Sequence, residues 1–221
     1  MDEVKVYIRS SSSSLLHKFQ TKKTSVFGNA DVGSGGEMDT TVCSSLTPPD
    51  MKLHLLTAVT RTENLPKLKK SISKASVRGV QTEWHQLFDL DREHVGGQAL
   101  KNQMLDEVSD GWIMVLDDDT ILHPKLLKRL RDVVNDGVKA VVVSQEHDGG
   151  NVRHAAPANA QLGRIDCGQV IIRREMIGNE RIPLSYDGDG RFLEKLLRGQ
   201  NGVLYLDEPL SYYNALRRDS D

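Results

Sequence analysis

Three successive carboxylates, Asp117, Asp118 and Asp119, follow a short apolar run at residues 112–116. The run has no polar alternation, which is typical of a strand buried on both faces in a parallel sheet covered by helices. Ligands of such sheets bind beyond the carboxyl ends of the strands. Adjacent like charges raise one another's pKa unless a positive charge compensates, and a hard divalent cation takes oxygen ligands. The pattern therefore predicts a ligand or metal site. The alternative is an acidic turn that caps the helix expected at Pro124, although a cap needs one acid and not three.

The elements that must position these acids alternate along the chain. Strands are expected at residues 53–59, 80–88, 112–116 and 138–143, and helices at residues 64–75, 94–108 and 124–134. This order predicts an α/β fold with a mostly parallel central sheet. The pattern then loosens into a long loop at residues 146–163, followed by a strand at 169–173, a helix at 191–198 and a strand at 203–206.

Residues 1–51 differ in composition from the rest of the chain. They contain serine and glycine runs and end near Pro48 and Pro49, with sparse apolar residues. We expect a flexible or extended N-terminal arm here and one folded domain at residues 52–221. The arm is either a disordered tail or leader, or a segment that packs on a partner subunit in a homo-oligomer. Alternating apolar residues predict a short strand within residues 2–9.

The overall composition excludes several classes of protein. The 221-residue chain has a formal net charge of −2 and is 5% aromatic, which gives no reason to expect nucleic-acid binding. Cys43 and Cys167 form no metal or redox motif, and two free thiols are expected. No apolar stretch approaches the roughly 20 residues of a membrane span, and the N-terminus lacks the apolar core of a signal peptide. We therefore expect a cytoplasmic protein.

Four segments together resemble a GT-A fold glycosyltransferase, closest to the family 2 transferases. They are residues 55–61 with the following Asn64-Leu65, the helix around Asn102, the Asp-x-Asp motif at residues 115–119, and the acidic segment at residues 186–193. The closing strand at residues 205–213 is also similar. The resemblance implies a Rossmann-like sheet flanked by helices, and an enzyme that moves a sugar from a nucleotide-diphosphate donor, expected to be a UDP-sugar, to an unknown acceptor hydroxyl.

The resemblance also implies roles for the acids. Asp119, the last acid of the Asp-x-Asp motif, is the first candidate ligand of a Mn²⁺ or Mg²⁺ ion that would neutralise the leaving diphosphate. Asp117 is expected to contact the metal or the ribose, and Asp118 the sugar or the turn. Asp189 is the favoured general base of an inverting reaction, and Asp187 is the second candidate. Stereochemistry stays open, because a retaining reaction needs no such base.

Residues at the ends of two earlier strands would bind the nucleotide. The resemblance assigns Thr57, Thr60 and Arg61 to the uracil and ribose, with Arg61 a possible bidentate phosphate donor. It also points to Asp89 as a contact to the base and to Asn102 in the segment before the metal motif. Two alternatives remain: a nucleotidyltransferase that makes nucleotide sugars, which usually has a Gly-rich basic loop absent here, and a non-catalytic binding module.

Overall fold

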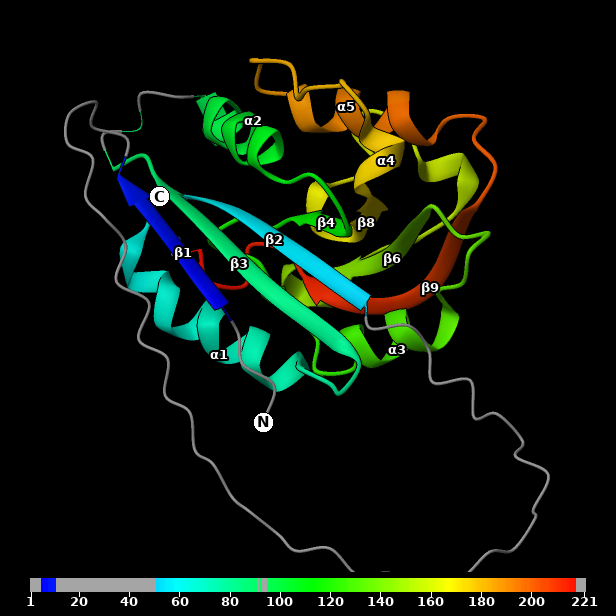
Figure 1. The fold of residues 1–221 in the computed structure, drawn as a ribbon, viewed down its shortest axis with the longest axis horizontal. Coiled ribbons are helices and arrows are strands. Elements are labelled where there is room, and N and C mark those ends of the chain that lie inside the picture. The colour runs from blue at the N-terminus through cyan, green and yellow to red at the C-terminus, as the bar shows by residue number, and fades with distance from the viewer. Residues whose placement is uncertain (1–4, 11–50, 91, 93–94, 218–221) are drawn as a thin grey trace, which may run out of the picture. The chain divides into compact units, whose positions relative to one another are not determined.

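The computed structural model describes residues 5–10, 51–90, 92 and 95–217, and this part of the chain is α/β. One sheet has the strand order β1-β3-β2-β4-β8-β6-β9-β5, with β7 paired to β6 (Figure 1). The strands are β1 (Lys5–Ser10), β2 (Met51–Val59), β3 (Val80–Phe88), β4 (Trp112–Val115), β5 (Ile121–Leu122), β6 (Ala140–Glu146), β7 (Val152–Arg153), β8 (Val170–Arg173) and β9 (Val203–Tyr212). The helices are α1 (Leu65–Ala75), α2 (Gln98–Glu107), α3 (Leu126–Val133), α4 (Arg174–Ile177) and α5 (Gly188–Leu197).

The long ladders of the sheet are parallel. β2 pairs in parallel with β3 and β4, and β6 pairs in parallel with β9. β8 lies between β4 and β6 and is antiparallel to both, so β4 and β6 still run in the same direction. The carboxyl ends of β2, β3 and β4 therefore meet at one edge. The loops after β2 and β4 both leave from that edge, and they contain Thr60, Arg61 and the three acids at residues 117–119, which are among the residues predicted to bind the donor or its metal.

Helices cover both faces of the sheet. One core joins the sheet to α2, α4 and α5, and the other joins it to α1 and α3 (Figure 1). Successive residues of β2 enter opposite cores, with Leu55 on the α1 side and Leu56 on the α2 side. Because both faces are covered, the strand needs apolar side chains at consecutive positions. This explains the unbroken apolar runs in the sequence.

The second half differs most from the expected elements. The last strand, β9, continues to Tyr212, beyond residue 206 where the apolar pattern ended it and close to residue 213 where the resemblance ended it. Its extension pairs with β5, a two-residue strand that the sequence did not predict, as it did not predict α4. α5 begins at Gly188, three residues before the predicted start. Short elements and strand extensions like these depend on a partner strand, so periodicity alone cannot find them.

The N-terminal region is described only in part. Residues Lys5–Ser10 form β1, parallel to β3, and overlap the stretch at residues 2–9 where alternation predicted a strand. The remaining residues of the expected arm, including Cys43, lie outside the described residues. The division into an arm at residues 1–51 and a domain at residues 52–221 stays a prediction, as do the homo-oligomer and the cytoplasmic location. None of the helices described is long and apolar enough to cross a membrane.

Candidate active site

A cavity of about 590 Å³ opens at the carboxyl edge of the parallel strands. It is lined by residues from segments far apart in the sequence: the loop after β2, α2, the loop after β4, the start of α5 and the segment after β9. Seven predicted site residues are among the lining: Thr60, Arg61, Asp117, Asp118, Asp119, Asp187 and Asp189. The fold therefore brings the Asp-x-Asp motif and the later acidic segment into one pocket.

Asp118 fixes the loop that follows β2. Its Oδ2 accepts hydrogen bonds from the backbone N–H of Thr60 at 2.6 Å, from the Thr60 hydroxyl at 2.9 Å and from the Arg61 backbone N–H at 2.8 Å. Its Oδ1 accepts from the Arg61 guanidinium at 3.0 Å. Because Asp118 is buried and both oxygens have partners, it supports the turn, which is one of the two roles expected for it.

Asp117 has a buried counter-charge. The ammonium of Lys101, on α2, lies 2.8 Å from Asp117 Oδ1, and the Lys101 side chain is only 4% exposed. Burial alone would lower the pKa of Lys101, but the nearby acidic groups, led by Asp117, hold this pKa above its ordinary value. Lys101 therefore stays charged. Asp189 also acts on this pKa, so the ammonium lies within electrostatic reach of both acidic segments.

Asp119 carries uncompensated negative charge. Burial, and then the charges of Asp117 and Asp118, raise the pKa of Asp119 to about 6, although Arg61 and Arg217 oppose this shift. The Arg61 guanidinium lies 3.4 Å from Asp119 Oδ2. A buried carboxylate with excess negative charge around it fits a divalent cation. Within the described part of the chain, however, the three carboxylates do not gather their oxygens within 4.8 Å of one another. An ion here would need oxygens from a ligand as well.

The two acids of the later segment have different surroundings. Asp187 accepts hydrogen bonds from the Ser185 hydroxyl at 2.8 Å and from Arg191 Nε at 2.7 Å, and these bonds, led by that of Arg191, lower the pKa of Asp187 to about 2. Asp189 lies in the first turn of α5, and its Oδ1 accepts from the Gly190 N–H at 2.9 Å. Both acids are half-buried in the pocket lining, but the Asp187 carboxylate is occupied by the Ser185 hydroxyl and by an ion pair with Arg191.

Three predicted nucleotide contacts are not among the lining residues. Thr57 is fully buried and accepts a hydrogen bond from Trp84 Nε1 at 2.9 Å. The side-chain amide of Asn102 donates from Nδ2 to the Ile182 carbonyl and accepts at Oδ1 from the Ile182 N–H, both at 2.8 Å. These two hydrogen bonds connect α2 to the segment before α5. Asp89 is buried and its N–H donates to the Val59 carbonyl at 2.9 Å. These residues hold the walls of the pocket together and do not line it.

The comparison with known families covers the three acids after β4, Lys101 and the acidic segment at the start of α5. The sequence profile of glycosyl transferase family 2 matches residues 71–193, which is more than half of the chain. The chain belongs to glycosyl transferase family 2. The match favours glycosyl transfer over the nucleotidyl transfer kept as an alternative above. No curated protein was found to match the sequence significantly.

Solved structures of glycosyltransferases have the same fold as this family 2 transferase. TarS from S. aureus superposes with a TM-score of 0.57 at 12% identity, covering 73% of this chain and 36% of TarS. TarS 1-349 in complex with UDP-GlcNAc gives a TM-score of 0.54 at 12% identity, covering 73% and 58%. The mannosyltransferase PcManGT from Pyrobaculum calidifontis, in complex with GDP-Man and Mn²⁺, gives 0.56 at 12% identity, covering 78% and 59%. The chain thus spans less than two thirds of each of these structures.

Several lining residues of the transferase were not predicted as site residues. Lys101 lies three and four residues before Met104 and Leu105, which are in the apolar core, so helical spacing could have indicated its burial. Asp166 is buried, and its surroundings raise its pKa to about 6, first through burial and then through the charge of Asp117. It accepts from the Gly168 N–H at 2.8 Å. Because Asp166 follows an irregular loop, no periodic pattern in the sequence indicates its burial.

Proposed function

We propose that this transferase moves a sugar from a nucleoside-diphosphate donor, a UDP-sugar, to an acceptor hydroxyl, with a divalent metal and with inversion. The observation that carries the proposal is the shared cavity: Asp119 and Asp189, 70 positions apart, line one pocket beside the Arg61 loop. The named complexes of TarS with UDP-GlcNAc and of PcManGT with GDP-Man and Mn²⁺ support a donor of this class.

At the donor end, Asp119 is the residue proposed to hold Mn²⁺ or Mg²⁺, with Asp117 as its second ligand or as a contact to the ribose. The ion, when bound, would act as a Lewis acid and neutralise negative charge on the leaving diphosphate. Asp118 keeps Thr60 and Arg61 in place through four hydrogen bonds, so the Arg61 guanidinium is positioned for a phosphate oxygen. Lys101 offsets part of the negative charge of the acids before a donor binds.

At the acceptor end, Asp189 is the proposed general base. Its carboxylate accepts the proton of the acceptor hydroxyl while that oxygen forms a bond to the anomeric carbon and the bond to the diphosphate breaks. The choice of Asp189 over Asp187 rests on their partners. Arg191 and Ser185 occupy the Asp187 carboxylate and keep its pKa near 2, which makes it a poor proton acceptor.

The test compares Asp189→Asn with Asp187→Asn. Loss of a general base lowers turnover by roughly 10²–10⁴-fold. We expect this loss in Asp189→Asn, with the calorimetric affinity for UDP and Mn²⁺ nearly unchanged, because asparagine keeps the shape and the bond to the Gly190 N–H. Asp187→Asn should keep most of its turnover. Donor hydrolysis, screened over several sugar nucleotides, measures turnover without knowledge of the acceptor.

Two results would contradict the proposal. If no nucleoside diphosphate binds with Mn²⁺ or Mg²⁺ present, the donor assignment is wrong. If Asp189→Asn loses donor binding together with turnover, Asp189 has a structural role and the base must be sought elsewhere. A non-catalytic binding module, the remaining alternative, would bind the donor without hydrolysing or transferring it.

A further inference from the structure

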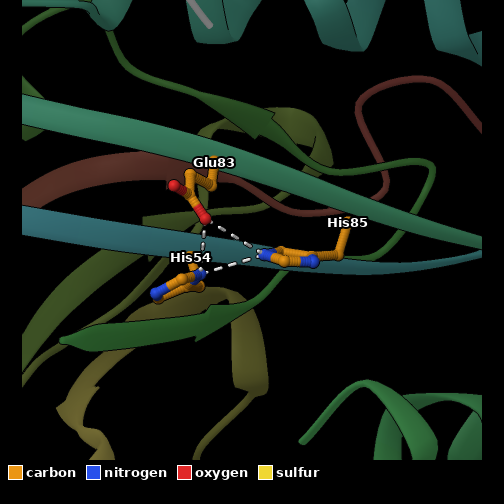
Figure 2. A group of neighbouring side chains, drawn as sticks. All are labelled: His54, Glu83 and His85. Carbon is orange, nitrogen blue, oxygen red and sulfur yellow. Dashed lines mark hydrogen bonds and ion pairs between the residues drawn. The ribbon is translucent and has the colours of Figure 1, made fainter. Parts of the chain in front are cut away.

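A second group of ligating side chains lies away from the pocket, on strands β2 and β3. His54 on β2 is paired in register with Glu83 on β3, and His85 follows two residues later on β3. Because side chains alternate along a strand, all three are on one face of the sheet, the face that also carries Leu56 and α2. Figure 2 shows the two imidazoles and the carboxylate directed toward a common point.

The spacing of the three atoms matches a small metal ion. His54 Nδ1 lies 2.9 Å from His85 Nε2 and 3.5 Å from Glu83 Oε2. His85 Nε2 and Glu83 Oε2 are 4.0 Å apart. A tetrahedral zinc ion with bonds of 2.0–2.2 Å separates its ligand atoms by about 3.3–3.5 Å. The observed distances bracket this value. Shifts of a few tenths of an ångström in the side chains would bring all three atoms into bonding range.

We propose that His54, Glu83 and His85 form a transition-metal site, with Zn²⁺ as the best-matched ion. Two imidazole nitrogens with one carboxylate oxygen suit zinc and its neighbours, whereas Mg²⁺ and Ca²⁺ prefer oxygen ligands. Three protein ligands leave a fourth position, and the His85 side chain, 14% exposed, gives water access to it.

The far side of His54 supports this assignment. His54 Nε2 is buried and has no hydrogen-bond partner in the described part of the protein, although Asp110 Oδ1 lies 3.6 Å from it. A carboxylate at this position commonly fixes the tautomer of a metal-bound histidine by accepting its remaining N–H. If Asp110 moved slightly closer and accepted a hydrogen bond from Nε2–H of His54, the Nδ1 atom of His54 would be unprotonated and would face Glu83 and His85. The Lys52 ammonium lies 3.8 Å from Glu83 and 3.2 Å from Asp110, so it competes with a metal ion for these two carboxylates.

The site is separate from the donor pocket. None of the three side chains is among the residues that line the pocket. His54 lies four residues before Ala58, the pocket residue on β2, which is about 13 Å along a strand that rises about 3.3 Å per residue. A metal bound to both strands would clamp β2 to β3 midway along their lengths. Its role is therefore stabilisation of the fold, and it does not depend on the proposed transfer reaction.

The experiment measures zinc binding by the full chain after removal of metal with a chelator. Zn²⁺ is titrated in competition with a chromophoric chelator, and Co²⁺ is used as a second probe because four-coordinate Co²⁺ absorbs strongly in the visible range. We expect one site with a Kd of about 1 μM or below. Its affinity should fall by more than 100-fold in Glu83→Gln and His54→Gln, and by about 10-fold in Asp110→Asn. The melting temperature of the parent chain should rise with Zn²⁺.

Controls separate this site from the acids of the pocket. Asp119→Asn should keep the zinc site and its Co²⁺ spectrum even if it loses metal-dependent donor binding, so the two proposals can fail independently. His123→Gln changes a histidine just after β5, outside the cluster, and should bind zinc like the parent. Circular dichroism checks that each variant is folded. If His54→Gln does not fold, Glu83→Gln still tests the site, because glutamine keeps the shape of the glutamate side chain. The proposal is overturned if the parent chain does not bind Zn²⁺, or if folded Glu83→Gln binds it equally well.

Discussion

Replacing Asp118 by alanine should remove the hydrogen bonds that hold the loop after β2, which forms one wall of the donor pocket. The change removes four acceptor contacts to Thr60 and Arg61 at 2.6–3.0 Å and leaves the guanidinium of Arg61 without its main counter-charge. Both side chains are largely buried, at 4% exposure for Asp118 and 15% for Arg61. Water therefore cannot fully replace the lost carboxylate.

The size of the effect follows from these contacts. A hydrogen bond to a charged group contributes about 1.5–3 kcal/mol, but bonds that share one acceptor are not additive. Removing one partner of a buried ion pair costs about 3–5 kcal/mol, and we expect Asp118→Ala to fall in this range. At about 2–4 °C per kcal/mol for a domain of this size, the melting temperature should fall by roughly 6–20 °C. Asp118→Asn keeps one acceptor and should cost less.

Urea denaturation followed by circular dichroism measures the free energy of unfolding, and calorimetry with UDP and Mn²⁺ measures donor affinity. Asp106→Ala is the matched control, because Asp106 is 60% exposed and forms a surface ion pair with Arg181, which is worth about 1 kcal/mol or less. If Asp118→Ala costs no more than Asp106→Ala, Asp118 does not hold the loop. If Asp118→Ala is stable yet loses donor binding, Asp118 contacts the ligand directly.

Two further predictions concern Asp119, the acid proposed to hold the metal, and the start of α5. The pKa of Asp119 is about 6 in the fold against 3.8 ordinarily, so its burial costs no stability below pH 4 and progressively more as pH rises through 6. Asp119→Asn should therefore stabilise the metal-free protein by about 2–3 kcal/mol at pH 7.5 but not at pH 4, as urea denaturation in EDTA would measure; an equal difference at both values contradicts this. Gly188→Ala would set its Cβ 2.0 Å from the Pro183 carbonyl oxygen, so the backbone before α5 must shift and turnover should fall at least 10-fold. Gly137→Ala, whose Cβ would meet a side-chain oxygen at 3.3 Å, is the control, and equal turnover in both variants would show that the start of α5 tolerates the shift.

Much of the first half of the fold could be predicted because its signals are local. β3 spans the expected residues, and β2, β4, α1 and α3 begin or end within a few residues of their predicted bounds. β5 and the extension of β9 could not be predicted from periodicity, because β5 pairs with β9 and the extension of β9 pairs with both β5 and β6. Glu208 and Pro209 interrupt the apolar pattern within β9, so periodicity ended the strand at residue 206 and only the resemblance extended it to residue 213.

The candidate site, like the fold, could be predicted only in part. The sequence pointed to Asp117, Asp118 and Asp119 through three acids after a buried strand, and their expected roles came from the resemblance to the family, because the three residues alone carry no sign of their partners. These partners come from elsewhere in the chain. Lys101 pairs with Asp117, and the loop after β2 occupies Asp118, which leaves Asp119 with the raised pKa.

The sequence by itself determined the order of strands and helices, the acids at a strand end and the resemblance to the family, because each is set by neighbours along the chain. Only the tertiary structure decided which acids share a pocket and which are already paired. It also brought His54 opposite Glu83 and within 2.9 Å of His85. These contacts join strands and helices distant in sequence, and parallel strands acquire their register only when the intervening crossover folds.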